Sequence, residues 1–399
     1  MEFLERIKNK RIYADHASST PVDRRVISRL KKSLTDVFGN PSAFHQEGVK
    51  AKKILEDART RISGTLGAHP DEILFTSGGT EADNLALCGS VEAMRNKYPN
   101  RKLHIVVSAI EHAAIIEASK KVSSFVAVDF APVDTDGYID LLELKKLITK
   151  DTVCVSVMHA NNEIGTVQPI KEISKIIRQE RKQRDTDFPI YFHTDACQSF
   201  VYKSISVEDL GVDLLTINSS KIYGPKGVGA LYKKRNVALA PLFHGGVQEF
   251  GLRAGTENVP LIDAFSFAVE INEKIKEKES KRLSKLQTFF VGQLQKNFPS
   301  VVINGGLTDR LPNNVNITLP GFSSESLVLY LDSAGISVSE KSACKSDEEE
   351  SSHVIQAISG NKDSTSGSIR FSFGRSTRKK DIKKILITLK RITNLLSQK

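Results

Sequence analysis

Reactive side chains follow four apolar segments of the sequence, each time directly where the apolar run stops. After these four runs come residues 111–112 (EH), 159–163 (HANNE), 195–198 (DACQ) and 219–221 (SSK). They supply imidazoles, amides, carboxylates and a primary amine, which are groups suited to acid–base and covalent chemistry. Because ligands of open parallel sheets bind beyond the carboxyl ends of the strands, we expect these four places to converge on one site.

Two of these residues, Lys221 and Asp195, fit one particular kind of chemistry. Lys221 precedes a tight turn, and a lysine that loses water at the mouth of a sheet is suited to forming a Schiff base. Asp195 could pair with a pyridinium nitrogen, since a nearby carboxylate shifts the pKa of its partner by about 1–3 units. Each residue also has a plain structural alternative, a surface loop lysine for Lys221 and a helix N-cap for Asp195.

A glycine pair lies directly before a predicted helix. Gly79 and Thr80 follow Gly78, and small or apolar residues then recur at helical spacing. Glycines let backbone N–H groups approach an oxyanion, and the N-terminus of a helix favours negative charge. This pattern suits a phosphate, although a glycine pair before a helix is often only a turn.

The four cysteines divide into two kinds. Cys88, Cys154 and Cys197 lie in apolar or structured surroundings and are expected to be small buried residues. Cys344 lies in the polar stretch 339–346 (SEKSACKS) and is the candidate reactive thiol. The scattered spacing predicts no disulfide framework and no metal site.

The elements that must position these residues alternate along the chain. From about residue 70 to 235, short β-branched runs alternate with helical patterns, which is typical of a parallel sheet with crossover helices. After residue 265 a long charged helical pattern gives way to short strands, which predicts a second α+β domain. The predicted strands are 104–108, 152–158, 190–193, 214–218, 300–304, 314–318 and 368–372, and 170–183 is a predicted helix.

Composition and charge limit the class of protein. The chain has 399 residues, 40% of them hydrophobic, and no apolar run as long as the roughly 18 residues that cross a bilayer. We therefore expect a cytoplasmic protein without membrane contact. The net charge of +10 comes largely from lysine-rich helical patterns such as residues 378–391. We interpret this positive charge as the solvated outer faces of amphipathic helices. The alternative is a surface that contacts an acidic protein or a nucleic acid.

An ordered series of motifs extends this interpretation over nearly the whole chain. Through these motifs the sequence resembles the class V aminotransferase branch of the fold-type I pyridoxal-phosphate (PLP) enzymes, and within it the NifS/IscS-type cysteine desulfurases. The motifs are residues 13–21 (YADHASSTP), 39–42 (GNPS), 76–84 (TSGGTEADN), 111–112 (EH), 161–165 (NNEIG), 195–199 (DACQS), 221–227 (KIYGPKG), 251–258 (GLRAGTEN), 342–344 (SAC) and 368–375 (SIRFSFGR).

The resemblance implies a fold and a division into domains. It predicts an α/β fold of the fold-type I PLP-dependent transferases. A large domain, residues 20–265, would contain a mostly parallel seven-stranded sheet flanked by helices and would bind the cofactor. A smaller α+β domain, residues 1–19 and 266–399, would carry the catalytic cysteine loop.

The resemblance also implies a role for each matching residue. Lys221 looks like the lysine that binds PLP covalently and moves a substrate proton, and His112 like the histidine that stacks on the cofactor ring. Asp195 and Gln198 would contact the ring nitrogen and the phenolic oxygen. The remaining implied contacts are Gly79, Thr80 and Ser220 to the phosphate, Thr256 to the phosphate from the other subunit of a homodimer, Asn162 to both cofactor and substrate, and Arg370 and Asn40 to the substrate.

The implied reaction is removal of sulfur from L-cysteine. Cys344 is similar to the family's sulfur acceptor, which becomes a persulfide while L-alanine is released. The spacing from Cys344 to Arg370 resembles the branch with a long catalytic loop. The sulfur would pass to a protein acceptor, such as an iron–sulfur scaffold or a sulfur carrier for tRNA thiolation. No direct binding of nucleic acid is expected.

The chain departs from the family pattern in two regions, before Lys221 and before Cys344, and other functions stay open. Ser220 stands where the family usually has histidine and Asn218 where it usually has serine, and the glycine common before the Ser-Ala-Cys motif is replaced by Lys341. The alternatives are another PLP reaction, such as selenocysteine cleavage or transamination, and a basic scaffold or RNA-binding protein that has lost its chemistry. A reactive Cys344 favours desulfuration over the former, and the retained site residues argue against the latter.

Overall fold

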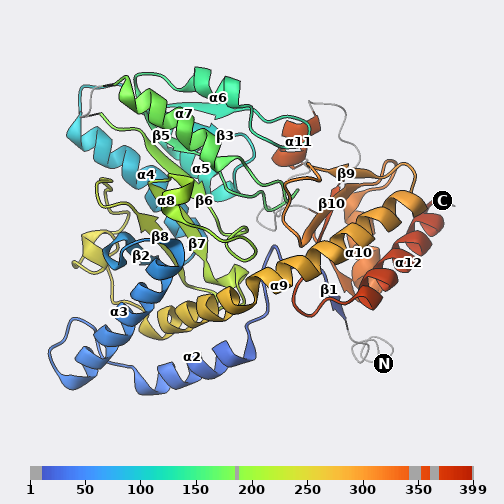
Figure 1. Cartoon of the computed structure of the whole chain (residues 1–399), viewed down its shortest axis with the longest axis horizontal. Coiled ribbons are helices and arrows are strands. Elements are labelled where there is room, and N and C mark those ends of the chain that lie inside the picture. Colours follow the sequence, from blue (N-terminus) through green and yellow to red (C-terminus); the bar gives the residue numbers. More distant parts are fainter. Residues whose placement is uncertain (1–10, 185–187, 341–351, 360–367, 398–399) are drawn as a thin grey trace.

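A seven-stranded sheet forms the centre of the larger part of the molecule (Figure 1). The computed structural model describes residues 11–184, 188–340, 352–359 and 368–397, so Cys344 lies outside the described residues. Across the sheet the strands are β2 (Ile73–Thr76), β8 (Gly229–Lys233), β7 (Leu214–Asn218), β6 (Tyr191–Asp195), β5 (Thr152–Ser156), β3 (His104–Ser108) and β4 (Ala127–Ala131).

The predicted mostly parallel sheet of seven strands is confirmed. Strands β7, β6, β5, β3 and β4 pair in parallel, and β8 runs antiparallel to both of its neighbours, β2 and β7. β3 and β7 have the predicted bounds, whereas the other two predicted strands shift at their ends. β6 extends to Asp195, which pairs with Thr216 of β7, and β5 ends at Ser156, its last residue paired with β6.

Helices cover both faces of this sheet (Figure 1). Alternate residues of a strand point to opposite faces, so that Ile105 and Val107 of β3 join one apolar cluster and Val106 joins the other. Buried residues of α4 and α5 belong to the first cluster, and those of α3, α7 and α9 belong to the second. The helices of this part are α2 (Arg24–Asp36), α3 (Gln46–Leu66), α4 (Gly79–Lys97), α5 (Ala113–Val122), α6 (Leu141–Leu147), α7 (Ile170–Lys182) and α8 (Val207–Leu210).

A smaller group of strands and helices consists of C-terminal elements and the N-terminal strand β1. Its antiparallel sheet has the strand order β12, β10, β9, and a separate parallel pair joins β1 to β11. The elements are β1 (Ile12–Tyr13), β9 (Val302–Asn304), β10 (Asn314–Thr318), β11 (Ile336–Ser337), β12 (Ser368–Ser372), α10 (Ser324–Ser333), α11 (His353–Ser359) and α12 (Lys379–Leu396).

The long helix α9 (Val259–Asn297) connects the two parts (Figure 1). Near its start Asp263 pairs with Arg29 of α2, and further along Phe290 packs against Phe371 of β12. The predicted domain boundary at residue 265 falls inside this helix. The division into two domains therefore stays a prediction.

The N-terminal segment also joins the two parts. Asp15 forms a bridge with Ser372 of β12. Five residues later, the backbone N–H and the hydroxyl of Thr20 both donate to the carbonyl oxygen of Ser220, at 2.9 Å each. The chain between these two anchors therefore runs past the carboxyl end of β7.

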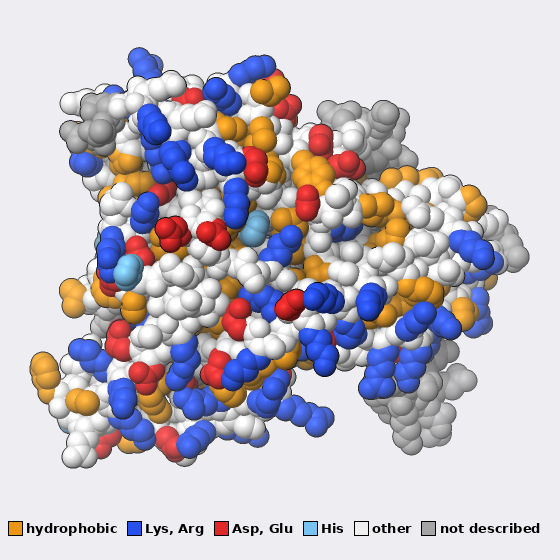
Figure 2. All heavy atoms as spheres, in the orientation of Figure 1, with side chains coloured by type: hydrophobic (Ala, Val, Ile, Leu, Met, Phe, Trp, Pro, Cys, Tyr) orange, Lys and Arg blue, Asp and Glu red, His pale blue; other side chains and the backbone are white. Residues whose placement is uncertain are grey.

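In helix α12 the basic residues lie on the outer face, in agreement with the expected amphipathic pattern. In α12 the apolar residues Ile382, Ile385 and Leu389 are buried, while Lys383 and Lys384 are exposed. Figure 2 shows Lys and Arg side chains spread over the visible face and mixed with acidic ones. Among the described residues, no helix combines the length and the apolar composition needed to cross a membrane.

One buried ion pair fixes α3 against the edge of the large sheet. Arg59 of α3 donates to both carboxylate oxygens of Glu249, at 2.9 and 2.8 Å, and both side chains are almost fully buried. Glu249 also accepts the backbone N–H of Phe75 in β2 at 2.9 Å. The guanidinium lies 4.9 Å from the centre of the Phe75 ring. The ion pair between Arg59 and Glu249 thus holds helix α3, strand β2 and the segment that carries Glu249 together.

Replacing Arg59 with alanine is expected to lower the free energy of unfolding by about 3–5 kcal/mol, because Glu249 would keep a buried charge without its partner. Chemical denaturation followed by circular dichroism measures the loss. The matched control is Arg235→Ala, which removes an exposed pair with Asp71 and is expected to cost less than about 1 kcal/mol. Equal losses in the two variants would contradict the structural role given to the buried pair.

Candidate active site

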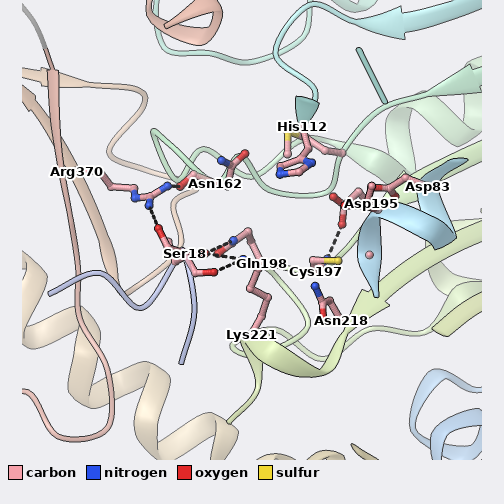
Figure 3. A pocket seen from close by; sticks show the side chains of 14 residues that line it. Ser18, Asp83, His112, Asn162, Asp195, Cys197, Gln198, Asn218, Lys221 and Arg370 are labelled. Atoms are coloured by element: carbon pink, nitrogen blue, oxygen red, sulfur yellow. Dashed lines mark hydrogen bonds between the residues drawn. The ribbon is translucent and has the colours of Figure 1, made fainter. Parts of the chain in front are cut away.

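Four neighbouring strands of the large sheet end around one cavity of about 200 Å³ (Figure 3). These strands are β3, β5, β6 and β7, and the residues that follow or end them contribute to the lining, as predicted. The N-terminal segment, α4 and β12 complete it. The lining residues are Ala17, Ser18, Gly79, Thr80, Asp83, His112, Met158, Asn162, Asp195, Cys197, Gln198, Asn218, Lys221 and Arg370.

Lys221 reaches the cavity from the 3₁₀ turn η3 (Ser219–Lys221) that follows β7. Its amine donates to the carbonyl oxygens of Ala17 at 3.0 Å and Ser18 at 2.6 Å. Burial lowers the pKa of Lys221, and the positive charge of Arg370 acts in the same direction. Both effects favour the unprotonated, nucleophilic amine, which is the state that Schiff-base chemistry requires.

Asp195 ends β6 on the side of the cavity opposite Arg370 (Figure 3). One of its carboxylate oxygens accepts the backbone N–H of Cys197 at 2.8 Å, which fixes the side chain in place. Gln198 of the same turn donates its amide to the carbonyl oxygen of Ala17 at 2.9 Å. The turn after β6 therefore carries both a fixed carboxylate and a link to the N-terminal segment.

A buried polar cluster lies behind Asp195. Burial, followed by the negative charge of Asp195, raises the pKa values of Asp83 and Glu111 well above the usual range. Burial lowers the pKa of His193 to about 4, and its Nε2 lies 3.7 Å from an Asp83 oxygen. Burial thus favours the protonated form of the two carboxyl groups, and the imidazole is neutral at pH 7.

His112 is the N-cap of α5, and this role fixes its protonation state. Its Nδ1 accepts the backbone N–H of Ala114 at 3.1 Å, so the hydrogen of the neutral ring lies on Nε2. Burial lowers the pKa of His112, which keeps the ring neutral at pH 7. The ring faces the cavity (Figure 3).

The N-terminus of α4 opens into the cavity at Gly79 and Thr80. A Cβ atom at position 79 would lie 3.1 Å from the Cys197 sulfur and 3.4 Å from the Asn218 amide nitrogen. Only glycine leaves this space free, and the helix terminus presents N–H groups and a favourable dipole to an anion. The structure therefore supports the phosphate interpretation more than that of a plain turn.

Arg370 of β12 reaches the cavity from the smaller part of the molecule. Its side chain is 3% exposed and donates to the backbone oxygen of Asn162 at 3.0 Å, the carboxylate of Asp15 at 2.9 Å and the hydroxyl of Ser18 at 2.6 Å. A guanidinium at this place suits a carboxylate ligand.

Several predicted site residues do not line the cavity. Ser220 turns its hydroxyl toward the Asn218 side chain at 3.3 Å, and exposed Asn40 accepts the backbone N–H of Ser42 at 2.9 Å. Thr256 lines a second cavity of about 220 Å³, together with residues from β2 and the loop after η4 (Glu249–Gly251). The roles predicted for these residues and for Cys344 stay predictions.

Sequence reasoning missed Ser18, Asp83 and Met158, and expected Cys197 to be only a small buried residue. Cys197 is buried but also faces the cavity, whereas Cys88 is half-buried. Burial raises the pKa of the Cys197 thiol, with Asp195 acting in the same direction, so the thiol stays protonated. Asp83 lies one helical turn after Gly79 and therefore on the same face of α4, so its position at the cavity could have been predicted from this spacing.

Within the described ranges no three His, Cys, Asp or Glu side chains form a possible metal site.

Comparisons with known proteins agree with this geometry. The model of the family "Aminotransferase class-V" matches residues 12–385. The chain is 42% identical over 388 residues to "Cysteine desulfurase IscS" of Dictyoglomus turgidum, covering 97% of this chain and 95% of the relative. It is 43% identical over 378 residues to "Cysteine desulfurase IscS 1" of Archaeoglobus fulgidus, covering 94% and 95%.

Solved structures give the same result. A "NifS-like protein" superposes with a TM-score of 0.87 at 33% identity, covering 96% of this chain and all of the other. The structure described as "SspA in complex with cysteine" has a TM-score of 0.78 at 34% identity, covering 91% and 98%. Fold, cavity and sequence similarity agree over nearly the whole length, and the chain therefore belongs to the class-V aminotransferase family.

Proposed function

We propose that this chain is a PLP-dependent cysteine desulfurase that converts L-cysteine to L-alanine and takes the sulfur on Cys344. The observation that carries the proposal is the single cavity in which Lys221, Asp195 and His112 face Arg370. The named relatives over nearly the full length are cysteine desulfurases, which supports the choice of substrate.

The cavity fits PLP in its distribution of charge and space. Lys221 offers an amine, Asp195 a carboxylate, and the N-terminus of α4 an anion site where Gly79 leaves the room free. Lys221 would bind the cofactor covalently, Asp195 would hold its ring nitrogen, Gln198 and Asn162 would lie beside its phenolic oxygen, and Gly79 and Thr80 would hold its phosphate. When bound, PLP supplies an electron sink for charge that develops on the substrate carbon.

The residues of the chain would then orient the substrate and move its protons. Lys221, with its lowered pKa, is suited to accept the proton of the substrate Cα. Neutral His112 would stack over the ring and offers the hydrogen on Nε2 as a donor. Arg370 would bind the substrate carboxylate with its planar fork, and Asn162 would lie beside it.

Cys344 lies outside the described residues, but both flanks of its segment lie beside the site. On one side Arg370 donates its backbone N–H to the carbonyl oxygen of Ser339 at 2.7 Å. On the other, His353 of α11 lies with Nε2 2.9 Å from the carbonyl oxygen of Glu111. These anchors support the proposal that the Cys344 thiolate attacks the substrate sulfur. The carbon–sulfur bond breaks, a sulfur–sulfur bond forms on Cys344, and the carbon is protonated to give L-alanine.

A homodimer belongs to the same proposal. Large apolar side chains are exposed on the loop between α2 and α3 and near η4, including Phe38, Phe44 and Val247 with exposures of 77%, 101% and 87%. Exposed patches of this kind are typical of protein interfaces. Thr256 lines the second cavity and not the one with Lys221, which is consistent with a role at the partner's phosphate site. Asn40 of the same exposed loop would reach substrate only through such an assembly.

The proposal also includes a protein that accepts the sulfur and a location in the cytoplasm. A persulfide must be passed to another thiol, so a protein acceptor such as an iron–sulfur scaffold or a sulfur carrier for tRNA thiolation is expected. The cytoplasmic location rests on the sequence alone.

Desulfuration through Cys344 is tested by alanine release from L-cysteine, with PLP and a thiol reductant present. The wild-type chain should form L-alanine, and Cys344→Ser should lose nearly all of this activity while it still binds PLP. Cys88→Ser is the matched control, because Cys88 lies outside the cavity, and it should keep its activity. Alanine release by Cys344→Ser at the wild-type rate would show that another group or reaction is responsible.

Covalent binding of the cofactor depends on Lys221. Lys221→Ala should purify without the visible absorbance of a bound PLP Schiff base and should lose activity by a factor of at least about 10³, because nucleophile and proton carrier are removed together. The exposed Lys226, five residues later in the same turn, gives the control Lys226→Ala, which should keep both the absorbance and the activity. A coloured Lys221→Ala protein that loses its colour only on substitution of a second lysine would contradict the assignment.

His112→Asn separates the two roles of His112. Asparagine can replace the N-cap bond to Ala114, so the stability of the protein should change by less than about 1 kcal/mol. The ring above the cofactor is lost, so kcat should fall by about 10²–10⁴. Steady-state kinetics and thermal unfolding measure the two effects. Loss of stability with unchanged kcat would mean that His112 acts only as a cap.

A further inference from the structure

The N-terminal segment places a carboxylate of the protein on Arg370. We propose that Asp15 holds the place of the substrate carboxylate on the Arg370 guanidinium, and that the substrate binds by displacing it. The proposal rests on the function proposed above in one respect, because it takes Arg370 as the group that binds the substrate carboxylate.

The hydrogen bonds of the guanidinium carry the argument. Nη2 donates to Asp15 Oδ1 at 2.9 Å and to Ser18 Oγ at 2.6 Å, so both of its hydrogens are used. Nη1 donates to the Asn162 carbonyl oxygen at 3.0 Å. Among the described residues, none is a hydrogen-bond partner of the buried Nε.

The geometry of arginine decides what an incoming carboxylate can do. A carboxylate that binds two neighbouring N–H groups must use Nη2, together with either Nε or Nη1, because these are the two forked edges of the guanidinium. Nη2 has no free hydrogen here. A two-point contact with the substrate therefore requires that Asp15 or Ser18 leave Nη2, and of these two only Asp15 also repels the incoming negative charge.

Burial explains why the site contains its own carboxylate. The Arg370 side chain is 3% exposed, and a buried guanidinium without an anion would be costly. The Asp15 side chain is 18% exposed, so it can regain water when it leaves. Exchange of one carboxylate for another keeps Arg370 paired in both states.

The backbone around Asp15 is fixed, which confines the exchange to the side chain. Ser372 donates its backbone N–H to the Ala14 carbonyl oxygen at 2.7 Å, and Ala17 donates its N–H to the Ser372 hydroxyl at 2.9 Å. The carbonyl oxygen of Ala17 accepts the amine of Lys221. A side-chain rotation at Asp15 can therefore free Arg370 while the contacts of Lys221 stay in place.

Competition of this kind predicts that Asp15 weakens the binding of carboxylates. Asp15→Asn keeps the shape and a neutral acceptor for Arg370 but removes the competing charge. A hydrogen bond between two charged groups is stronger than one to a neutral amide, so its replacement by a neutral one should tighten carboxylate binding by about tenfold.

The test compares two probes on the PLP-loaded protein by calorimetry. 3-Mercaptopropionate has the thiol and the carboxylate but no amine, and cysteamine has the thiol and the amine but no carboxylate. Asp15→Asn should bind 3-mercaptopropionate about tenfold more tightly than the wild type does, with cysteamine affinity unchanged within about twofold. With L-cysteine, KM should fall while kcat does not rise. Unchanged or weaker binding of 3-mercaptopropionate overturns the proposal.

Three variants complete the test. Asp15→Glu restores the charge and should return the affinity toward that of the wild type. Asp23→Asn removes a carboxylate of the same segment that pairs with Arg375 instead, and it should leave both probes unaffected. Asp15→Ser provides the same comparison if Asp15→Asn does not fold.

The two proposals fail separately. If the wild type forms L-alanine but Asp15→Asn binds 3-mercaptopropionate no more tightly, the role proposed for Asp15 is overturned and the desulfurase function stands. If the wild type forms no L-alanine but the tenfold tightening is seen, the competition between Asp15 and the substrate carboxylate stands, and it belongs to a different PLP reaction.

Discussion

Parallel pairing of β7, β6, β5 and β3 is the constraint on which the candidate site depends. These four strands are neighbours and run in one direction, so their carboxyl ends meet at one edge of the sheet. Lys221, Asp195, Asn162 and His112 follow or end these strands, and each is brought to the same cavity. The short turns after the strands then fix the side chains through local hydrogen bonds, such as that from Cys197 to Asp195.

Burial of titratable groups in and around the cavity shifts their pKa values. Burial, followed by the charge of Asp195, raises the pKa values of Asp83 and Glu111 and favours their neutral forms. On the opposite side, Lys221 is pushed toward its neutral form by burial and by Arg370. Distribution of ionised and neutral groups, more than their number, gives the cavity its chemical character.

The N-terminal segment connects these two sides. Ala17 and Ser18 accept the Lys221 amine with their backbone oxygens, while Asp15 and Ser18 contact Arg370 with their side chains. The segment is anchored on β12 at Ser372 and on the turn after β7 through Thr20. The substrate binding proposed for Arg370 and the proton transfer proposed for Lys221 are thus linked by a few residues that are remote from both in sequence.

The sequence alone determined the parallel sheet, the run of strand ends and the residues that they carry, because apolar periodicity and the position of reactive residues are local properties. It also determined the family through ordered motifs, which the comparisons confirm. It did not show that Asp83 and Cys197 face the cavity or that Asp15 lies on Arg370. Asp15 and Arg370 are 355 residues apart, and only the packing of the N-terminal segment on β12 brings them together. Protonation states were decided at the same level, because burial in the folded chain, and not residue type, shifts the pKa values of Lys221, Asp83 and His193.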